Sequence, residues 1–377
     1  MSGIHVLMTA DAVGGVWQYA LELARALDKA DVRTTLAVLG PAPGADQAAD
    51  ARAVPNLTLR ALDLPLDWTA DRQEDLEKAA AAISDLATGI GADLVHLNSV
   101  TLAAGGRFTM PVVAVCHSCL ATWWDAVRGT EPLPEDFVWR VRMGARGMAA
   151  ADALMAPTAA FAQATARAYG LAQAPLVVRN GRSAPATRGV PHRAPEGDFV
   201  FTAGRLWDEG KNVAAIDRAA GRIDIPVIAA GPNGGPNGAR INLEHARPVG
   251  RLGEEEISAW LGLRPIFVSM SRFEPFGLAV LEAAQAGCPL ILSDIPTFVE
   301  LWGGAAEFVE PNDDEALAAA IERLSSDPEH RRRLADAALE RSRQYTPGAM
   351  AEGALRVYRA LLLPGNQRPP RRLEAHA

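Results

Sequence analysis

The sequence contains few cysteines. Three cysteines in 377 residues are too few for a disulfide framework. Cys116 and Cys119 form a C-x-x-C pair, but the chain has no second pair to complete the four ligands of a structural zinc site. We therefore expect packed, reduced thiols here rather than metal or redox chemistry.

The sequence also lacks targeting and membrane signals. No apolar run is long enough to span a bilayer. Residues 1–8 have neither the basic start nor the long apolar core of a signal peptide. The net charge of -8 argues against nucleic acid as the main partner and gives no support for a broad basic surface that would bind anionic lipid. These absences predict a cytoplasmic protein without a transmembrane segment.

What is present is a regular alternation of short apolar strands and helices. A hydrophobic content of 49% indicates a well-packed protein, and the length suggests two domains. Alternating strands and helices predict an α/β fold with parallel sheets that carry helices on both faces. Strands are expected at residues 4–8, 34–39, 57–60, 93–97, 112–115, 153–155, 176–178, 199–202, 226–229, 266–268 and 289–292. Helices are expected at residues 16–27, 71–90, 135–150, 158–169, 213–222, 254–261, 278–286 and 347–363.

The chain divides at a polar segment rich in proline, glycine and arginine. Residues 182–197 are predicted to be a linker between residues 1–181 and residues 198–346. Ligands of such two-unit proteins prefer the cleft between the units, at the carboxyl ends of the strands. The polar tail, residues 364–377, is predicted to be disordered.

The most informative segment follows the expected strand at 266–268. A turn formed by Pro275, Phe276 and Gly277 leads into a helix, with Glu274 before the turn and Glu282 one turn inside the helix. The backbone N–H groups of Gly277, Leu278 and Ala279 would be the unpaired donors of the helix start, which is a natural seat for a phosphate. A phosphate flanked by two carboxylates suits a sugar nucleotide, because the acids accept hydrogen bonds from sugar and ribose hydroxyls. The alternative is a buried helix with two acids on its solvent side.

Three further segments follow expected strands. Gly14 and Gly15 open a helix, where they would let a ligand approach the backbone or would only form a tight turn. The glycine fingerprint of dinucleotide-binding proteins is absent, which disfavours an NAD-dependent oxidoreductase. Arg205 and Lys211 would clamp a diphosphate or would be solvated surface cations. His117 would position a sugar or would be structural.

These segments resemble motifs of retaining GT-B glycosyltransferases, especially of family 4. The segment from Glu274 to Glu282 resembles the Glu-x7-Glu motif of that family and the Glu-Pro-x-Gly-Leu segment of starch and glycogen synthases. The glycine pair resembles the family's Gly-Gly loop, and His117 resembles the histidine beside the transferred sugar. Residues 204–211 resemble the Gly-Arg-Leu-x-x-x-Lys stretch with one extra residue before the lysine. Residues 180–181 resemble the family's Pro-Asn-Gly-Val/Ile-Asp segment, but Arg182 and Ser183 follow them here, so a plain Asn-Gly turn remains the alternative.

The resemblance implies a fold and a reaction. It implies two Rossmann-like domains facing a cleft, with residues 1–181 on the acceptor side, completed by the helix at 347–363, and residues 198–346 binding the nucleotide sugar. The implied activity is that of a retaining hexosyltransferase, which moves a sugar from a nucleotide-diphosphate sugar to the hydroxyl of a small-molecule, glycan or lipid-linked acceptor.

The resemblance also implies roles for individual residues. Glu274 would bind hydroxyls of the transferred sugar, Glu282 would bind the ribose, and His117 would position the sugar. Gly14, Gly15 and Phe276 would also bind the donor. Arg205, Lys211 and the helix start would stabilise the leaving diphosphate. Because these groups would supply that positive potential and the chain has no Asp-x-Asp motif, we expect neither a metal nor a cofactor.

Two other functions remain open for the same fold. A nucleotide-sugar epimerase would need no acceptor, and a non-catalytic protein would retain only the sugar-nucleotide pocket. Product analysis with the donor alone separates an epimerase from a transferase. Transfer or slow donor hydrolysis would argue against a protein that only binds.

Overall fold

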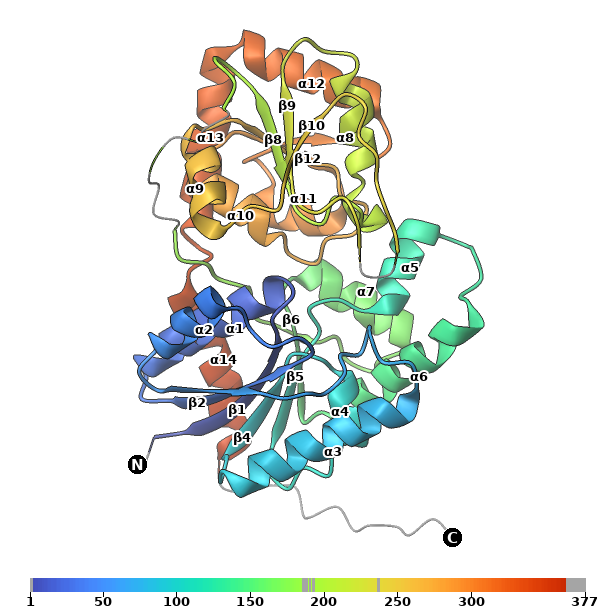
Figure 1. Ribbon diagram of the computed structural model, residues 1–377, viewed down its shortest axis with the longest axis vertical. Helices are drawn as coiled ribbons and strands as arrows, with labels where there is room; N and C mark the ends of the chain where they lie inside the picture. Colours follow the sequence, from blue (N-terminus) through green and yellow to red (C-terminus); the bar gives the residue numbers. More distant parts are fainter. Residues whose placement is uncertain (1–2, 185–188, 190, 192–193, 236–237, 364–377) are drawn as a thin grey trace.

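The computed structural model describes residues 3–184, 189, 191, 194–235 and 238–363, which form two α/β domains (Figure 1). The expected disorder of residues 364–377 and much of the expected linker lie outside the described residues. Among the helices described, none is both long and apolar enough to cross a membrane.

The first domain is built on a seven-stranded sheet in which every pair of neighbouring strands is parallel. The strand order is β3-β2-β1-β4-β5-β6-β7. The strands are β1 (His5–Asp11), β2 (Arg33–Leu39), β3 (Leu57–Ala61), β4 (Leu94–Leu97), β5 (Val112–Val115), β6 (Ala153–Ala156) and β7 (Leu176–Val177). The central strands are largely apolar because both faces are covered: Val6 and Met8 pack on one side and Leu7 on the other.

Helices cover both faces of this sheet. They are α1 (Gly15–Asp28), α2 (Ala45–Arg52), α3 (Gln73–Gly89), α4 (Thr101–Gly105), α5 (Leu120–Arg128), α6 (Glu135–Ala150) and α7 (Ala159–Tyr169). The last helix of the chain, α14 (Pro347–Leu362), returns to this domain and packs beside α1, where Met350 and Tyr358 join the apolar core (Figure 1).

The second domain repeats the same construction with six strands. The strand order is β10-β9-β8-β11-β12-β13, and all the pairs are parallel. The strands are β8 (Val200–Ala203), β9 (Val227–Ala230), β10 (Arg247–Gly250), β11 (Ile266–Ser269), β12 (Leu290–Ser293) and β13 (Glu307–Val309). The helices are α8 (Val213–Ala220), α9 (Glu254–Gly262), α10 (Leu278–Gln285), α11 (Pro296–Trp302), α12 (Asp314–Ser326) and α13 (Pro328–Ser342), with a short 3-10 helix η1 (Glu209–Lys211). The two parallel sheets confirm the predicted α/β fold class.

Each sheet has a switch point at which successive strands are added on opposite sides. In the first sheet β1 and β4 lie side by side at this point, and in the second β8 and β11 do. Ligands of open α/β sheets bind beyond the carboxyl ends of the strands at such points. The loops that follow these four strands therefore mark the candidate site.

The two domains also touch between α7 and α11. The carboxylate of Glu300 on α11 accepts hydrogen bonds from the backbone N–H groups of Ala159 (2.9 Å) and Ala160 (2.7 Å) at the start of α7. It also pairs with Arg179 at 2.6 Å. An acid from one domain thus caps a helix of the other, which satisfies otherwise unpaired donors.

Candidate active site

The loop between β11 and α10 holds Glu274 in place. Its backbone carbonyl accepts a hydrogen bond of 2.7 Å from the Thr297 hydroxyl, and its carboxylate accepts the backbone N–H of Phe276 at 3.4 Å. Gly277 then adopts φ 90°, a left-handed conformation that favours glycine, and a Cβ there would lie 2.9 Å from the Phe298 ring. The Glu-Pro-Phe-Gly turn is therefore set by both backbone conformation and packing.

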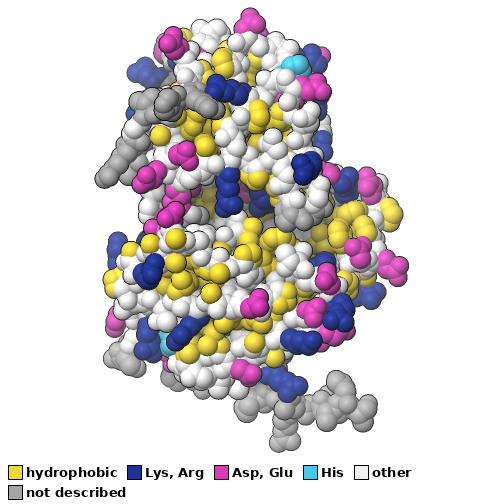
Figure 2. Space-filling view, in the orientation of Figure 1, with side chains coloured by type: hydrophobic (Ala, Val, Ile, Leu, Met, Phe, Trp, Pro, Cys, Tyr) yellow, Lys and Arg dark blue, Asp and Glu magenta, His cyan; other side chains and the backbone are white. Residues whose placement is uncertain are grey.

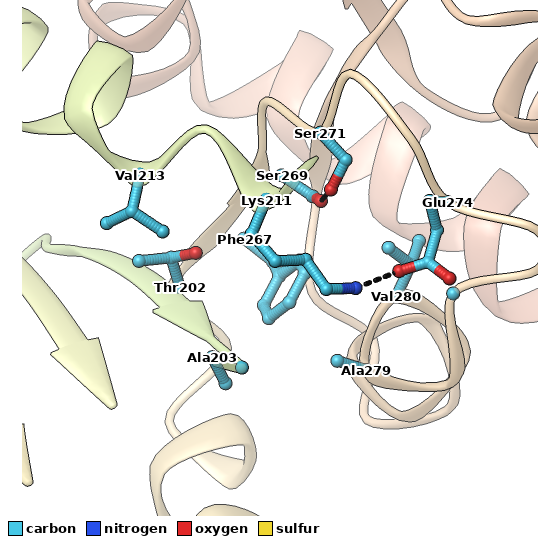
Figure 3. Close-up of a pocket in the computed structure, with 12 residues that line it drawn as sticks. Thr202, Ala203, Lys211, Val213, Phe267, Ser269, Ser271, Glu274, Ala279 and Val280 are labelled. Atoms are coloured by element: carbon cyan, nitrogen blue, oxygen red, sulfur yellow. Dashed lines mark hydrogen bonds and ion pairs between the residues drawn. The ribbon is translucent and has the colours of Figure 1, made fainter. Parts of the chain in front are cut away.

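Lys211 reaches the same place from the other side of the switch point. Its ammonium group forms an ion pair with the Glu274 carboxylate, and both side chains are largely buried (Figure 3). The pair lies in a pocket, whose lining residues are Thr202, Ala203, Gly204, Lys211, Val213, Phe267, Ser269, Ser271, Glu274, Gly277, Ala279 and Val280. The pocket thus combines a cation, a carboxylate, hydroxyl groups and the start of α10.

The β8–α8 loop that carries Lys211 is tied firmly to the motif loop. Asn212, in a left-handed conformation at the start of α8, donates to the carbonyls of Met270 (3.0 Å) and Pro311 (2.6 Å). The Gly210 carbonyl accepts the backbone N–H of Arg272 at 2.9 Å. These bonds hold the loop from which the Lys211 side chain reaches Glu274.

Arg205 begins the same loop and stays accessible. Its side chain is 53% exposed and pairs with Asp208 at 2.8 Å, while the other oxygen of Asp208 accepts the backbone N–H of Gly210 at 2.9 Å.

In the space-filling view the surface is hollowed between the domains, and Lys and Arg side chains are visible in the hollow (Figure 2).

The glycine pair of the first domain faces this set of residues. The Asp11 carboxylate accepts the backbone N–H groups of Val13 (2.9 Å) and Gly14 (3.2 Å), which orders the turn after β1. A Cβ on Gly14 would lie 3.9 Å from an Arg205 nitrogen, and one on Gly15 would lie 3.4 Å from Leu278. The structure therefore brings the glycine pair, Arg205 and the start of α10 together.

His117 follows β5 and is held by Asn98. Its Nε2 lies 2.8 Å from Asn98 Oδ1, while Asn98 Nδ2 donates to the Thr9 carbonyl at 2.6 Å. Since the amide oxygen can only accept, Nε2 of His117 carries the hydrogen and Nδ1 is an acceptor in the neutral ring. Burial, followed by the nearby His96, lowers the pKa of His117 to about 3. The ring is therefore suited to accept a hydrogen bond and unsuited to act as an acid near neutral pH.

A second histidine extends this chain of hydrogen bonds to the terminal helix. His96, on β4, places Nε2 3.2 Å from Asn98 Oδ1 and Nδ1 2.6 Å from the hydroxyl of Tyr358 on α14. Burial lowers the pKa of His96 to about 4. Sequence reasoning missed His96, Asn98 and Tyr358 as members of the site. The only signal in the sequence was His96, a polar residue within the otherwise apolar strand expected at 93–97. A position in a strand does not reveal which side chains the residue contacts.

Glu282 lies on α10 but away from the pocket shared by Lys211 and Glu274. Its Oε1 accepts a hydrogen bond of 2.9 Å from Nε of Arg182, at the junction between the domains. Burial raises the pKa of Glu282, and Arg182 opposes that rise. In the sequence alone, Arg182 stands out only as a departure from the family motif.

Phe276 and the two cysteines of the C-x-x-C pair are buried in the protein. The Phe276 ring is 3% exposed and packs edge-on against Tyr345, with ring centroids 5.7 Å apart, so the ring belongs to the core. Cys116 and Cys119 are buried free thiols. Among the residues described, no three His, Cys, Asp or Glu side chains are grouped to hold a metal ion.

Comparisons with known proteins agree with this architecture. The family model "Glycosyltransferase Family 4" matches residues 13–182, and "Glycosyl transferases group 1" matches residues 198–341. Together the two models match parts of both domains.

Similar curated proteins carry glycosyltransferase names. A glycogen synthase of Mycobacterium tuberculosis is 36% identical over 132 residues, which cover 34% of this chain. The matched stretch spans 32% of that protein, about a third of its length. The D-inositol 3-phosphate glycosyltransferase of Streptomyces bingchenggensis is 27% identical and matches 95% of this chain and 87% of its own length.

Similar solved structures share the fold. Sucrose-phosphate synthase from Thermosynechococcus elongatus superposes with a TM-score of 0.76 at 18% identity, over 95% of this chain and 99% of that one. HepE from Anabaena, in complex with UDP-glucose, gives a TM-score of 0.70 at 17% identity, over 95% of this chain and all (100%) of that one.

Proposed function

Since the chain belongs to the group 1 and family 4 glycosyltransferases and has their GT-B fold, we propose that it moves a sugar from a nucleoside-diphosphate sugar to an acceptor hydroxyl with retention of configuration. One observation carries this proposal. The Lys211–Glu274 pair lies in one pocket with the start of α10, and the glycine pair and Arg205 lie beside that helix start.

The cations and the helix start would hold the diphosphate. The first N–H groups of α10 have no partner within the helix and carry the positive end of its dipole. Lys211 adds a point charge, and the exposed Arg205 adds a fork of donors that can leave Asp208 for a phosphate. Fixed donors of this kind stabilise the charge that grows on the leaving diphosphate. We therefore propose a metal-independent reaction, for which a chelator should leave the rate unchanged.

The acids and the histidine would bind the transferred sugar and the ribose on either side of the diphosphate. Glu274 would accept hydrogen bonds from hydroxyls of the transferred sugar, and Glu282 would accept them from the ribose. His117 would accept one at Nδ1 and so help to position the sugar.

Transfer would then take place on one face of the sugar. The bond between the anomeric carbon and the diphosphate oxygen breaks, the acceptor oxygen bonds to the same face, and the acceptor proton passes to the departing phosphate. Names of similar proteins, including the HepE complex with UDP-glucose, favour a hexose on the donor. An acceptor hydroxyl completes the proposed reaction.

The first test is a thermal-shift screen of nucleoside diphosphates and their sugar conjugates, because specific binding raises apparent stability. The best donor is then assayed with a broad set of hydroxyl acceptors. Glu274→Ala should lower transfer at least about 100-fold, since interactions made at the reacting centre carry effects of this size. Glu329→Ala is the matched control, because the Glu329 side chain is 73% exposed on α13.

The outcomes separate the possible functions. Unchanged turnover in folded Glu274→Ala protein would contradict the role of that acid. Interconversion of donor sugars without an acceptor would indicate an epimerase. Calorimetry with the nucleoside diphosphate should show weaker binding by Arg205→Ala, and equal affinity would count against the diphosphate clamp.

A further inference from the structure

Arg182 lies where the two connections between the domains cross. Its backbone N–H donates to the carbonyl of Tyr345 at 3.1 Å, and its carbonyl accepts the side-chain amide of Gln285 on α10 at 2.8 Å. The preceding residue, Gly181, lies so close to the start of α14 that a Cβ would be 2.1 Å from the carbonyl oxygen of Thr346. The backbone that presents Arg182 is therefore fixed on both sides.

The guanidinium group of Arg182 joins three helices from both domains. Nε donates to Glu282 on α10 at 2.9 Å, and one terminal nitrogen donates to Gln18 on α1 at 2.8 Å. The same nitrogen lies 3.4 Å from Glu22 on α1, and the other lies 3.2 Å from Glu254 on α9. The Arg182 side chain is only 11% exposed, and the contacts with Glu22 and Glu282 are shielded from water, whereas Glu254 is 57% exposed.

This arrangement fixes the orientation of the Glu282 carboxylate. A guanidinium group is planar, so partners at its two terminal nitrogens determine where Nε points. Arg182 occupies Oε1 of Glu282, and no hydrogen bond to Oε2 is formed within the described part of the chain. One carboxylate oxygen is thus held by the protein and the other is available to a ligand.

Arg182 also opposes the rise in the pKa of Glu282 that burial causes. Burial favours its neutral form, and the neighbouring Glu254 and Glu22 act in the same direction, whereas Arg182 favours the carboxylate. A charged acceptor makes a stronger hydrogen bond to a hydroxyl group than a neutral one does.

We propose that Arg182 is a positioning residue for donor binding, which holds Glu282 so that its free oxygen accepts a ribose hydroxyl of the donor nucleoside. Because Arg182 is itself held by Gln18 and Glu22, the first domain helps to shape the nucleoside site of the second. This inference rests on the proposed function. It also gives a role to the residue at which this chain departs from the family's Asn-Gly-Val/Ile-Asp segment.

The test compares ligands with and without the hydroxyl. The nucleoside diphosphate selected by the thermal-shift screen is titrated by calorimetry, together with its 2′-deoxy and 3′-deoxy forms. Removing the hydroxyl that contacts Glu282 should weaken binding to the unaltered protein about tenfold or more, as for a hydrogen bond to a charged group. In Arg182→Met the parent nucleotide should bind about tenfold more weakly, and the deoxy form should lose little further affinity.

A matched control separates positioning from general stability. Arg179→Met removes another arginine of the same connection, whose partner is Glu300 and not Glu282. This variant should keep the full dependence on the ribose hydroxyl. Arg182→Lys retains the buried charge if the methionine variant does not fold. It should show a reduced dependence, because one ammonium group cannot reproduce the planar fork.

The results distinguish this inference from the function on which it rests. If removing the hydroxyl lowers the affinity equally in the unaltered protein and in the Arg182 variants, the positioning role is overturned. The proposed nucleotide binding would still stand. If the unaltered protein binds none of the nucleotides, the proposed function fails and the inference fails with it.

Discussion

Replacing Asn98 by leucine would test how His117 is held. The amide accepts a hydrogen bond from His117 and another from His96, and it donates to the Thr9 carbonyl. Leucine has a similar shape and none of these groups. Thr9 is 1% exposed, so its carbonyl would lose this partner away from water, and His96, which is 0% exposed, would keep at Nε2 only the 3.4 Å contact with the Tyr19 hydroxyl within the described chain. Each such group costs about 1–3 kcal/mol, and we expect the free energy of unfolding to fall by about 3 kcal/mol in total.

The same change should slow the reaction. Without the bond to Asn98, the His117 ring can rotate and its Nδ1 is no longer directed at the sugar. Misplacement of a positioning group commonly costs a factor of ten or more, so we expect kcat to fall at least about tenfold with a smaller effect on KM. Urea unfolding near neutral pH gives the stability, and steady-state kinetics with the selected donor and acceptor gives kcat.

Thr9→Val serves as the matched control. It removes the hydroxyl that accepts the backbone N–H of Asn98 at 2.9 Å and leaves the amide side chain of Asn98 in place. Stability should fall by about 1 kcal/mol and kcat should stay the same. Unchanged kcat in folded Asn98→Leu protein, or equal kinetic effects of both substitutions, would refute the reasoning.

Three further predictions concern stability. Burial lowers the pKa of His96 from 6.5 to about 4, so the unfolded chain binds a proton that the folded chain does not. The free energy of unfolding should therefore fall from about pH 6.5 towards pH 4, by up to about 1.4 kcal/mol per unit from this group, and a flat pH profile in urea unfolding would contradict this. Gly277→Ala should lower the free energy of unfolding by about 1–2 kcal/mol, because alanine disfavours the left-handed backbone at this position. It should also slow transfer by displacing the nearby Glu274. Stability and rate equal to those of the unaltered protein would count against a strained turn. Glu300→Gln should lower the free energy of unfolding by about 1–2 kcal/mol, because the acid caps α7 and pairs with Arg179. The free energy of unfolding of Glu329→Gln, at an exposed position, should stay within about 0.5 kcal/mol of the unaltered protein. Equal thermal unfolding temperatures of the two variants would contradict this prediction.

Most of the fold could be predicted from local pattern. The buried parallel strands are short unbroken apolar runs, and the expected helix at 71–90 corresponds to α3 (Gln73–Gly89). The prediction missed eight of the described α-helices and strands: α2, α4, α5, α11, α12, α13, β10 and β13. Two of these have weak patterns. β10 (Arg247–Gly250) is an exposed edge strand with a proline, and α2 (Ala45–Arg52) is short and buries only one residue. Such segments take their structure from neighbours that are distant in the sequence.

The candidate site could be predicted only in part. The motif segment, the glycine pair and the loop cations could be found because each follows a strand and has an unusual composition. The sequence could not show that Lys211 pairs with Glu274, that Arg182 donates a hydrogen bond to the Glu282 carboxylate, or that the Phe276 ring lies in the core. Each of these facts depends on which side chains meet after the loops converge.

The sequence by itself therefore determined the α/β alternation, the loop chemistry and the resemblance to a family, because these depend on the order of residues along the chain. The tertiary structure alone decided the protonated nitrogen of His117 and the partner of Glu282. His117 depends on Asn98, which follows another strand, and Glu282 depends on an arginine that lies 100 residues away in the chain. Hydrogen bonds act over about 3 Å, so only the folded chain determines which of these groups come within reach of one another.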